Sequence, residues 1–421
     1  MSADRSPSKG EGPMPRGWQA LSSTPVSLRA LLIGSAIGDF GNGFFRLALP
    51  WLVYNLTGSA AALGAMVALS YVPTLFLPFI GRLTDRMSVR RMLLASLVVQ
   101  FATLAALAIL LHQHRLSLYA ADAGAFLATG GAIGATAATE VTIQRLTPAP
   151  ARIAINGLWW MLFNISWYVS PALAGFAIGR FGVEGALVVN AVAVAVMMGP
   201  VFLLPRMDPV APLPAVRGRA SLGEPLVALR QARDVFAATV VFGYWTFTWA
   251  AVFALQVFLF RHRLHLAAPM VGVVGLVAGI APVILALTAP YILPRIRVVW
   301  LLSMALWVSG TGMVVLALAH NWWTATIAVG LIDAVTAPVG IVVSTLAQRA
   351  IPARLFGQVV GWQAVIQSGG TPVASLLAGI AAVAFGAGGA MLAAATLTLC
   401  GGLLLPLSPW RRVLEQKPPL R

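Results

Sequence analysis

Twelve long apolar runs make up most of the sequence, and they decide what the chain can fold into. Of the 421 residues 59% are hydrophobic and only 10% are charged, which is more apolar surface than a water-soluble protein can bury. A run of roughly 18–25 apolar residues is long enough for an α-helix to cross a bilayer. The sequence therefore predicts an all-α membrane protein with twelve transmembrane helices, centred on residues 27–52, 58–80, 92–112, 117–143, 154–179, 184–204, 232–260, 267–291, 298–318, 322–347, 355–384 and 388–409.

One internal break, rich in proline and arginine, divides these helices into two sets of six. We expect an N-terminal six-helix bundle at residues 27–204, a central cytoplasmic loop at 205–231 and a C-terminal six-helix bundle at 232–409. Residues 1–26 are predicted to be a disordered cytoplasmic tail and residues 410–421 a second cytoplasmic tail. Because residues 1–26 contain no compact apolar core, they are not expected to be a cleaved signal peptide.

The two halves are also related in sequence, which predicts two pseudo-symmetric bundles. A shift of 204 residues aligns residues 144–186 with the second half without a gap. Parallel six-helix repeats are expected to give such a match. The aligned groups are Gln144-Arg145 with Gln348-Arg349, Pro148-Ala149 with Pro352-Ala353, Leu173-Ala174-Gly175 with Leu377-Ala378-Gly379, and Phe181-Gly182 with Phe385-Gly386.

Membrane topology explains the positive charge of the chain. A net charge of +16 would suggest a nucleic-acid partner in a soluble protein, but most of the arginines fall in short loops between apolar runs. If the N-terminus is cytoplasmic, all but five of the 28 lysine and arginine residues lie in cytoplasmic segments, the exceptions being Arg46, Arg115, Arg180, Arg261 and Arg263. This asymmetry places both termini in the cytoplasm. We therefore expect a multi-pass protein of the plasma membrane, which is the inner membrane in a bacterium, and no nucleic-acid partner.

Asp39 is the first of three carboxylates that lie inside predicted membrane helices. A charge at that depth costs about 3 kcal/mol on insertion scales, so it usually faces a partner or a wet cavity. Asn42 and Arg46 share its helical face at i+3 and i+7. The functional interpretation makes Asp39 a proton- or cation-binding group, or the anchor of a cationic substrate. The alternative is a buried ion pair between Asp39 and Arg46 that only fixes helix packing.

Asp333 and Glu140 are the other two carboxylates. Asp333 lies near mid-depth in the tenth helix with Thr336 at i+3, and it belongs either to a substrate or coupling site or to a hydrogen-bonded packing contact. Glu140 lies one turn from the cytoplasmic end of the fourth helix. We interpret Glu140 as a gate or interface residue, with a coupling role as the alternative.

A short polar segment with five charges, residues 81–91, joins the second and third helices. It resembles the loop between helices 2 and 3 of the major facilitator superfamily, G-x-L-a-D-R-x-G-R-[KR], through Gly81, Leu83, Asp85, Arg86 and Arg90, with Ser88 in place of a glycine. The resemblance implies the major facilitator fold and alternating access, in which two six-helix bundles rock about a central site. It also implies a cytoplasmic latch formed by Gly81, Asp85, Arg86 and Arg90.

The fifth helix carries small residues at a spacing similar to the antiporter signature of that superfamily, G-x8-G-x3-G-P-x2-G-G. The matching residues are Gly157, Ser166, Ser170, Pro171 and Gly175, with serine replacing glycine at two of these positions. This pattern favours export. The alternative is an ordinary helix contact between small residues.

Aromatic and amide side chains predict a substrate cavity. An apolar and weakly specific site would use aromatic faces, including cation–π contacts, and glutamines could hydrogen-bond a substrate. Packing against lipid explains aromatic stripes equally well. The candidates are Trp160, Phe163 and Trp167 in the fifth helix, Tyr244 and Trp245 in the seventh, and Gln363 and Gln367 in the eleventh.

These expectations combine into a proton-driven exporter of small amphipathic molecules such as a drug, a secondary metabolite or a siderophore. The first three helices resemble the macrolide- and siderophore-exporting branch of the superfamily, in Gly38-Asp39, Ala48-Leu49-Pro50, Leu56-Thr57-Gly58-Ser59 and Tyr71-Val72-Pro73-Thr74. The alternatives are export of lysophospholipids or metal ions, or a receptor that does not transport. We expect no enzymatic activity, no cofactor, no resident metal, the proton gradient as driving force, and a monomer in the lipid bilayer.

Overall fold

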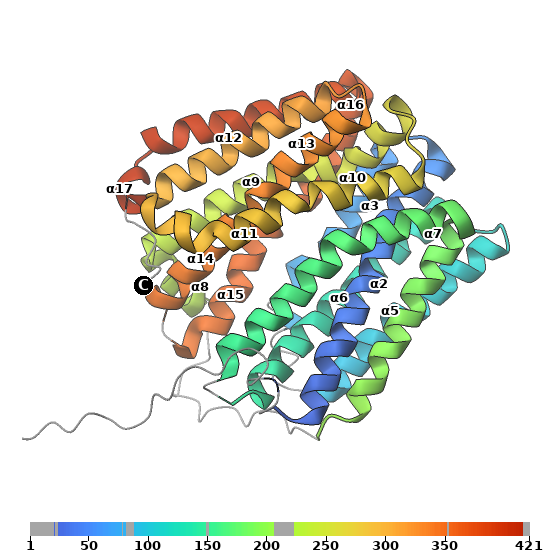
Figure 1. Cartoon of the computed structure of the whole chain (residues 1–421), viewed down its shortest axis with the longest axis horizontal. Coiled ribbons are helices and arrows are strands. Elements are labelled where there is room, and N and C mark those ends of the chain that lie inside the picture. The colour runs from blue at the N-terminus through green and yellow to red at the C-terminus, as the bar shows by residue number, and fades with distance from the viewer. Residues whose placement is uncertain are drawn as a thin grey trace, which may run out of the picture.

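The computed structural model describes residues 21, 24–77, 79–80, 88–148, 151–205, 223–351 and 353–415, and it contains only helices and their connections within that part of the chain. Figure 1 shows an N-terminal half and a C-terminal half, each a bundle of long helices. The N-terminal half contains α2 (Val26–Thr57), α3 (Ala60–Tyr71) with a 3-10 extension (Val72–Phe76), α5 (Val89–His112), α6 (Leu118–Leu146) and α7 (Arg152–Phe202).

The C-terminal half contains more interrupted helices. They are α9 (Arg233–Phe258), which ends in a π-helical turn (Leu259–Arg263), α10 (Ala268–Ala278), α11 (Ile280–Ile292), α12 (Val298–Ala317), α13 (Trp322–Ala334), α14 (Thr336–Ala350), α15 (Ala353–Ser368) and α16 (Thr371–Leu404). Two short helices, α8 (Gly223–Gln231) and α17 (Arg411–Leu414), lie at one end of this half (Figure 1). Seven helical stretches among the described residues are long and apolar enough to cross a membrane.

Two of these stretches are long enough to cross a membrane twice, and each bends back at a glycine. The stretches Gly157–Phe202 and Gln358–Leu407 span 46 and 50 residues. Gly182 has φ 70° and ψ −178°, and Gly386 has φ 74° and ψ 157°. Glycine adopts such positive φ values without the clash that a Cβ would cause. These glycines are partners in the sequence repeat, so the repeat marks the same turn in both halves.

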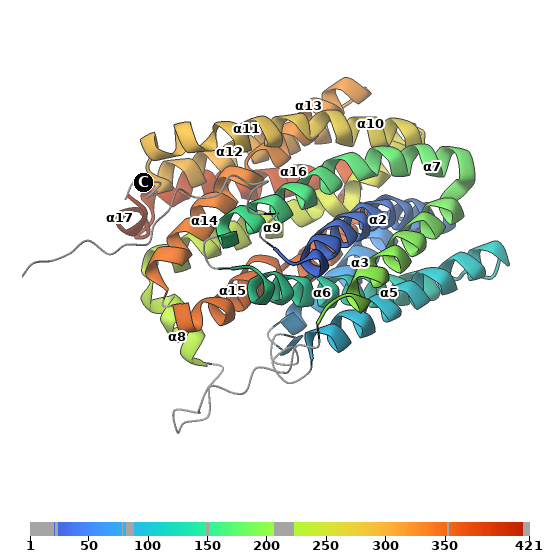
Figure 2. The same ribbon diagram turned by 60° about the horizontal axis from the view of Figure 1, so that its bottom comes forward.

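The two halves pack together through small residues. Helix α3 lies against α16 and α7 lies against α10, and the two ribbon views agree on these neighbours (Figures 1 and 2). A Cβ added to Gly379 would lie 3.1 Å from the Cα of Gly64, and one added to Gly272 would lie 2.8 Å from the Cα of Ala172. The backbones are therefore in direct contact, as in other interfaces built from small residues.

A cation–π contact also joins the halves, between α2 and the turn that follows α9. The guanidinium carbon of Arg261 lies 4.4 Å from the ring centroid of Trp51 and 5.6 Å from that of Tyr54. Arg261 donates a long hydrogen bond of 3.5 Å to the side-chain oxygen of Asn55. Tyr54 packs edge-on against Phe258 at 5.8 Å between ring centroids. We call this group the Arg261 contact.

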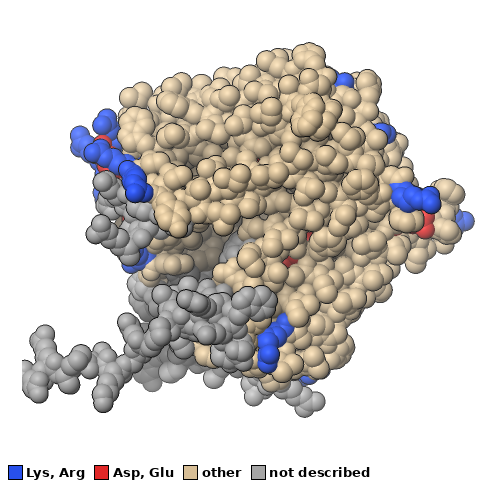
Figure 3. Space-filling model, viewed as in Figure 1, with Lys and Arg blue, Asp and Glu red and all other residues tan. Residues whose placement is uncertain are grey.

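The surface has a broad uncharged band with charges at its two ends. In the space-filling view, lysine and arginine gather at the ends of the molecule, and the face between them is almost entirely uncharged (Figure 3). An apolar band between charged ends is the surface that a bilayer requires. On the same face the surface is hollowed between the halves on the side of α14 and α15, and a few carboxylate atoms are visible near the middle of the band (Figure 3).

Candidate functional site

Arg46 of α2 lies against the fifth-helix tryptophan Trp167, on α7. Its guanidinium carbon is 3.4 Å from the Trp167 ring centroid, and one of its nitrogens donates to the Trp167 backbone oxygen at 3.3 Å. Asp39 is within electrostatic range of Arg46, but no described cation lies within 4.0 Å of the Asp39 carboxylate. The close Asp39–Arg46 ion pair considered from the sequence is therefore not formed.

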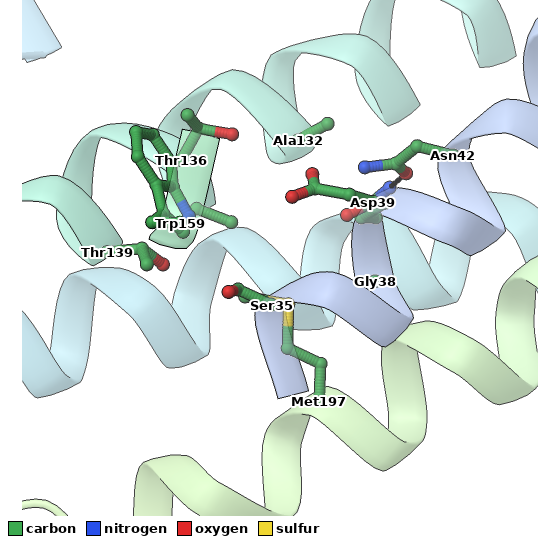
Figure 4. Close-up of a pocket in the computed structure, with 11 residues that line it drawn as sticks. Ser35, Gly38, Asp39, Asn42, Ala132, Thr136, Thr139, Trp159 and Met197 are labelled. Carbon is green, nitrogen blue, oxygen red and sulfur yellow. Dashed lines mark hydrogen bonds between the residues drawn. The ribbon is translucent and has the colours of Figure 1, made fainter. Parts of the chain in front are cut away.

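The carboxylate of Asp39 points into a small polar cavity inside the N-terminal half. Figure 4 shows it projecting from α2 toward α6, where Thr136 faces it. Asn42 lies against the carboxylate, and its side-chain oxygen accepts a hydrogen bond of 2.6 Å from Gln100 of α5. Asp39 and Asn42 thus share one polar pocket, while Arg46 is not part of its lining.

Asp333 lies near the junction of two helical segments in the C-terminal half. Helix α13 ends at Ala334 and α14 begins at Thr336, and Val335 between them keeps right-handed helical dihedral angles, so the two segments form one continuous stretch. The indole nitrogen of Trp249, on α9, donates to the Asp333 carboxylate at 3.2 Å. An ionisable group within a membrane-spanning helix usually faces a partner or a water-filled cavity, and here the partner is an indole donor.

Tyr168 brings the N-terminal half to the same place. It extends from α7 and packs on Gly279, the residue between α10 and α11, where an added Cβ would lie 2.7 Å from the Tyr168 ring. Tyr168 is within electrostatic range of both Asp333 and Arg46. Tyr168 therefore lies near a charged residue of each half.

A row of aromatic rings runs along α9 toward the N-terminal half. Ring centroids are 5.5 Å apart for Phe242 and Trp245, 6.1 Å for Trp245 and Trp249, and 5.3 Å for Trp249 and Phe253. Phe253 meets the edge of Tyr71, at the end of α3, at 5.9 Å. Asp333 is thus a single acid beside an aromatic row, a combination that suits an amphipathic ligand.

Several residues predicted to line the substrate cavity instead make contacts inside the C-terminal half. The Tyr244 hydroxyl donates to the backbone of Leu397 on α16, and the Trp245 indole donates to Ser309 on α12 at 2.9 Å. Gln363 is 5% exposed and donates to Thr239 at 3.0 Å. These three side chains connect helices of one bundle.

The remaining predicted cavity residues lie in different surroundings. The backbone oxygen of Gln367 accepts a hydrogen bond from Thr246, and its side chain is partly exposed. Phe163 lies 5.8 Å from Trp167 between ring centroids, so it belongs to the group around Arg46. The side chain of Trp160 lies outside the described part of the structure.

Glu140 is exposed on α6 and has no described ion-pair partner within 4.0 Å.

The predicted cytoplasmic latch can be followed only at Arg90. Gly81, Asp85 and Arg86 lie outside the described residues. Arg90, in the first turn of α5, donates to the backbone oxygen of Leu204 at 3.5 Å and lies 5.7 Å from the Phe202 ring centroid. A cation there satisfies a carbonyl just beyond the end of α7. The latch itself stays a prediction.

The small residues of the antiporter-like pattern pack α7 against two different helices. Ser166 donates to the backbone oxygen of Ala36 on α2 at 3.3 Å, and Ser170, fully buried, packs on Gly43 of α2. Pro171 and Gly175 lie against α10, where their neighbours are Gly272 and Ala268. Gly157 is exposed and has open space beside it. The pattern thus serves close packing, and its link with export stays a prediction.

Sequence reasoning missed three residues of this region, namely Tyr168, Gln100 and Thr139. Trp249 belongs to the aromatic cluster that the sequence shows in the seventh helix, four residues after Trp245. Thr139 lies one position before the candidate Glu140 and was not identified. Nothing in the sequence marks Gln100 or Tyr168, because their partners are distant along the chain.

Two membrane-embedded helical halves, in contact through small residues and with carboxylates at mid-depth, define the class of multi-pass transport proteins. The sequence places the chain within that class. The family model of the Major Facilitator Superfamily matches residues 31–297. The chain belongs to this superfamily.

Solved structures of several transporters have the same fold. The nucleoside transporter NupG is 14% identical, with a TM-score of 0.70, and the match covers 91% of this chain and 99% of NupG. A POT family transporter solved with a thioalcohol-conjugated peptide is 13% identical, with a TM-score of 0.73 and coverage of 94% and 100%. The human organic anion transporter MFSD10 (TETRAN) is 16% identical, with a TM-score of 0.61 and coverage of 90% and 100%. No curated protein sequence matched the chain.

Proposed function

We propose that the chain is a secondary active transporter that exports small amphipathic molecules in exchange for protons. In this proposal Asp333 is the group that binds the cargo in one state and the proton in the other. The observation that supports this most strongly is the position of Asp333, within a membrane-spanning helix and against Trp249. Tyr168 of the opposite half lies within electrostatic range of Asp333, so polar groups of both halves come near this acid.

A partly buried carboxylate within a membrane-spanning helix favours exchange over simple release. An ionised acid at mid-depth is costly, and the cost falls when the acid binds either a proton or a cationic or hydrogen-bond-donating cargo. One carboxylate cannot hold both at full strength. Proton binding from one side therefore displaces cargo, and cargo binding from the other side displaces the proton.

The arrangement of the halves suits alternating access. Small-residue contacts and the Arg261 contact hold the halves together, while the surface is hollowed on the side of α14 and α15 (Figure 3). We assign this conformation to a state that is open on one side only. Cargo would bind between Trp249 and the Arg46–Trp167 group, since aromatic faces line both.

Proteoliposomes with a trapped pH-sensitive dye test the proposal. Purified protein is challenged with a panel of lipophilic cations such as ethidium, together with macrolides, siderophores and lysolipids. For the unaltered protein we expect a saturable proton flux with at least one class of compound on the panel. For Asp333→Asn we expect that flux to be lost.

The control is Trp249→Phe, which keeps an aromatic ring but removes the indole donor to Asp333. It should retain the flux with an altered half-saturating concentration. If Asp333→Asn moves protons as well as the unaltered protein does, Asp333 is not the coupling group. If no compound on the panel drives a flux, export of amphipathic molecules is the wrong function.

A further inference from the structure

The cavity beside Asp39 contains an oxygen atom that the protein does not use for its own packing. Thr139 of α6 is 1% exposed, and its hydroxyl has no hydrogen-bond partner in the part of the chain that the structure describes. Figure 4 shows this hydroxyl and that of Ser35 pointing into the cavity from opposite helices. Leaving such a group unsatisfied costs about 1–3 kcal/mol. A bound species in the cavity would remove that cost.

The equivalent place in the other half shows that the fold does not require a polar cavity. A second small cavity lies between α9, α12 and the α13–α14 helix, which are the first, third and fourth membrane crossings of the C-terminal half. It is lined by apolar side chains, among them Phe242, Leu302, Leu306 and Val339. The cavity beside Asp39 also lies between the first, third and fourth helices of its half, α2, α5 and α6, and α7 adds Trp159 and Met197 to its lining. Its polar lining is therefore particular to the N-terminal half.

The chemistry of the lining selects the kind of occupant. Asp39 supplies one negative charge, and Ser35, Thr136 and Thr139 supply neutral oxygen atoms. Hard cations prefer oxygen ligands, and calcium and magnesium sites normally include more than one carboxylate or substrate phosphates. No group of three or more histidine, cysteine or acidic residues occurs among the residues that the structure describes. A single charge and several hydroxyls match a monovalent cation.

Neither the size of the cavity nor its neighbours oppose such an ion. The space holds a water-sized occupant, and a dehydrated sodium ion is smaller than a water molecule, so it fits. The nearest described cation, Arg46, is held by Trp167 and is not part of the lining. The Asp39 carboxylate contacts Asn42 but has no described cation within 4.0 Å, so its charge is available to a ligand.

We propose that this cavity is a sodium-binding site in which Asp39 supplies the charge and Ser35, Thr136 and Thr139 supply neutral oxygen ligands. The site lies in the N-terminal half, whereas the proposed cargo group Asp333 lies in the C-terminal half. Sodium binding does not depend on the identity of the cargo or on proton exchange at Asp333. Failure of one proposal can therefore be told from failure of the other.

Binding of radioactive sodium to the purified full chain in nanodiscs tests the site, with thermal unfolding in NaCl, KCl and choline chloride at equal ionic strength as a second readout. We expect saturable sodium binding and a higher unfolding temperature in NaCl than in the other two salts. Thr139→Val should weaken sodium binding about tenfold, because it removes one ligand to a charged group. Thr139→Ser should restore binding, and Asp39→Asn should abolish it.

Thr142→Val is the matched control. Thr142 lies on the same helix and is fully buried, but its hydroxyl donates to the backbone oxygen of Ala138 and does not line the cavity. It should bind sodium like the unaltered protein, and so should Asp333→Asn. Equal unfolding temperatures in the three salts, or equal binding by the Thr139→Val and Thr142→Val variants, would overturn the proposal. A response to pH without any response to sodium would overturn it as well.

Discussion

Arg46 is held by a single neighbour through two different contacts. Its guanidinium group stacks on the Trp167 ring and also donates to the backbone oxygen of that residue. A planar guanidinium can make both contacts at once, whereas a lysine ammonium cannot. In this structure Arg46 therefore fixes α2 to α7, and no described cation lies within 4.0 Å of the Asp39 carboxylate.

Replacing Arg46 should reveal this bracing role. Arg46→Ala should destabilise the protein by about 2 kcal/mol, the value of a desolvated cation–π contact, and Arg46→Lys should recover only part of it. The measurement is the unfolding temperature of the purified protein, followed by tryptophan fluorescence. An Arg46→Lys variant as stable as the unaltered protein would show that charge alone, and not stacking, is required.

For single residues, the sequence predicted which side chains are candidates for the site but not which neighbours they contact. Asp39 and Asp333 could be identified as candidates, because a charge inside an apolar run needs a physical reason. What each of them faces could not be predicted. The contact between Asn42 and Gln100 and that between Trp249 and Asp333 join residues 58 and 84 positions apart, and they depend on how each helix is rotated in its bundle.

Among the helices, α7 and α16 show how a repeat in sequence becomes a repeat in structure. The pairs Phe181-Gly182 and Phe385-Gly386 occupy the turn in each helix, and both glycines have positive φ. The apolar runs predicted the helices on either side of these turns. They did not predict the irregular turns after Ala278 and Ala334, although Pro282 and Pro338 follow these residues by four positions and cannot donate the helical hydrogen bond to their carbonyls.

A substitution at the turn should be costly, and one elsewhere in the same helix should not. Gly182→Ala should lower stability by about 1–2 kcal/mol, since an alanine is strained at that φ. Gly199→Ala is the control, because Gly199 is helical and has open space beside it, so alanine should be neutral or slightly stabilising there. Unfolding temperatures of the two variants give the comparison. Equal values would mean that the turn tolerates a side chain by relaxing.

The two halves in this conformation are held by contacts that leave no room for larger side chains. A Cβ at Gly272 would meet the backbone of Ala172, so Gly272→Leu cannot be accommodated without moving α10 away from α7. If the halves rock as rigid bundles, that movement also opens the second small-residue contact, between α3 and α16. The cost of opening includes the Arg261 contact.

A cysteine reporter tests this coupling between the two contacts. The exposed Cys400 is first replaced by serine, and Ala60→Cys is then introduced at the α3–α16 contact, where the residue is 6% exposed. Adding Gly272→Leu should raise the rate of maleimide labelling at position 60 several-fold. Gly275→Leu, on the same helix but with open space beside the glycine, should leave the rate unchanged. Equal rates in both variants would show that the contacts open independently.

The two small cavities lie at equivalent places in the two halves, but one lining is polar and the other is apolar. Apolar side chains, among them Phe242 and Trp245, line in one half the cavity that Asp39 and Thr139 line in the other. An artificial chain assembled from two copies of the first half would gain a second polar cavity and lose the acid at Asp333 and its tryptophan donor. Such a chimera should contain two ion-binding cavities and lack the acid that binds cargo.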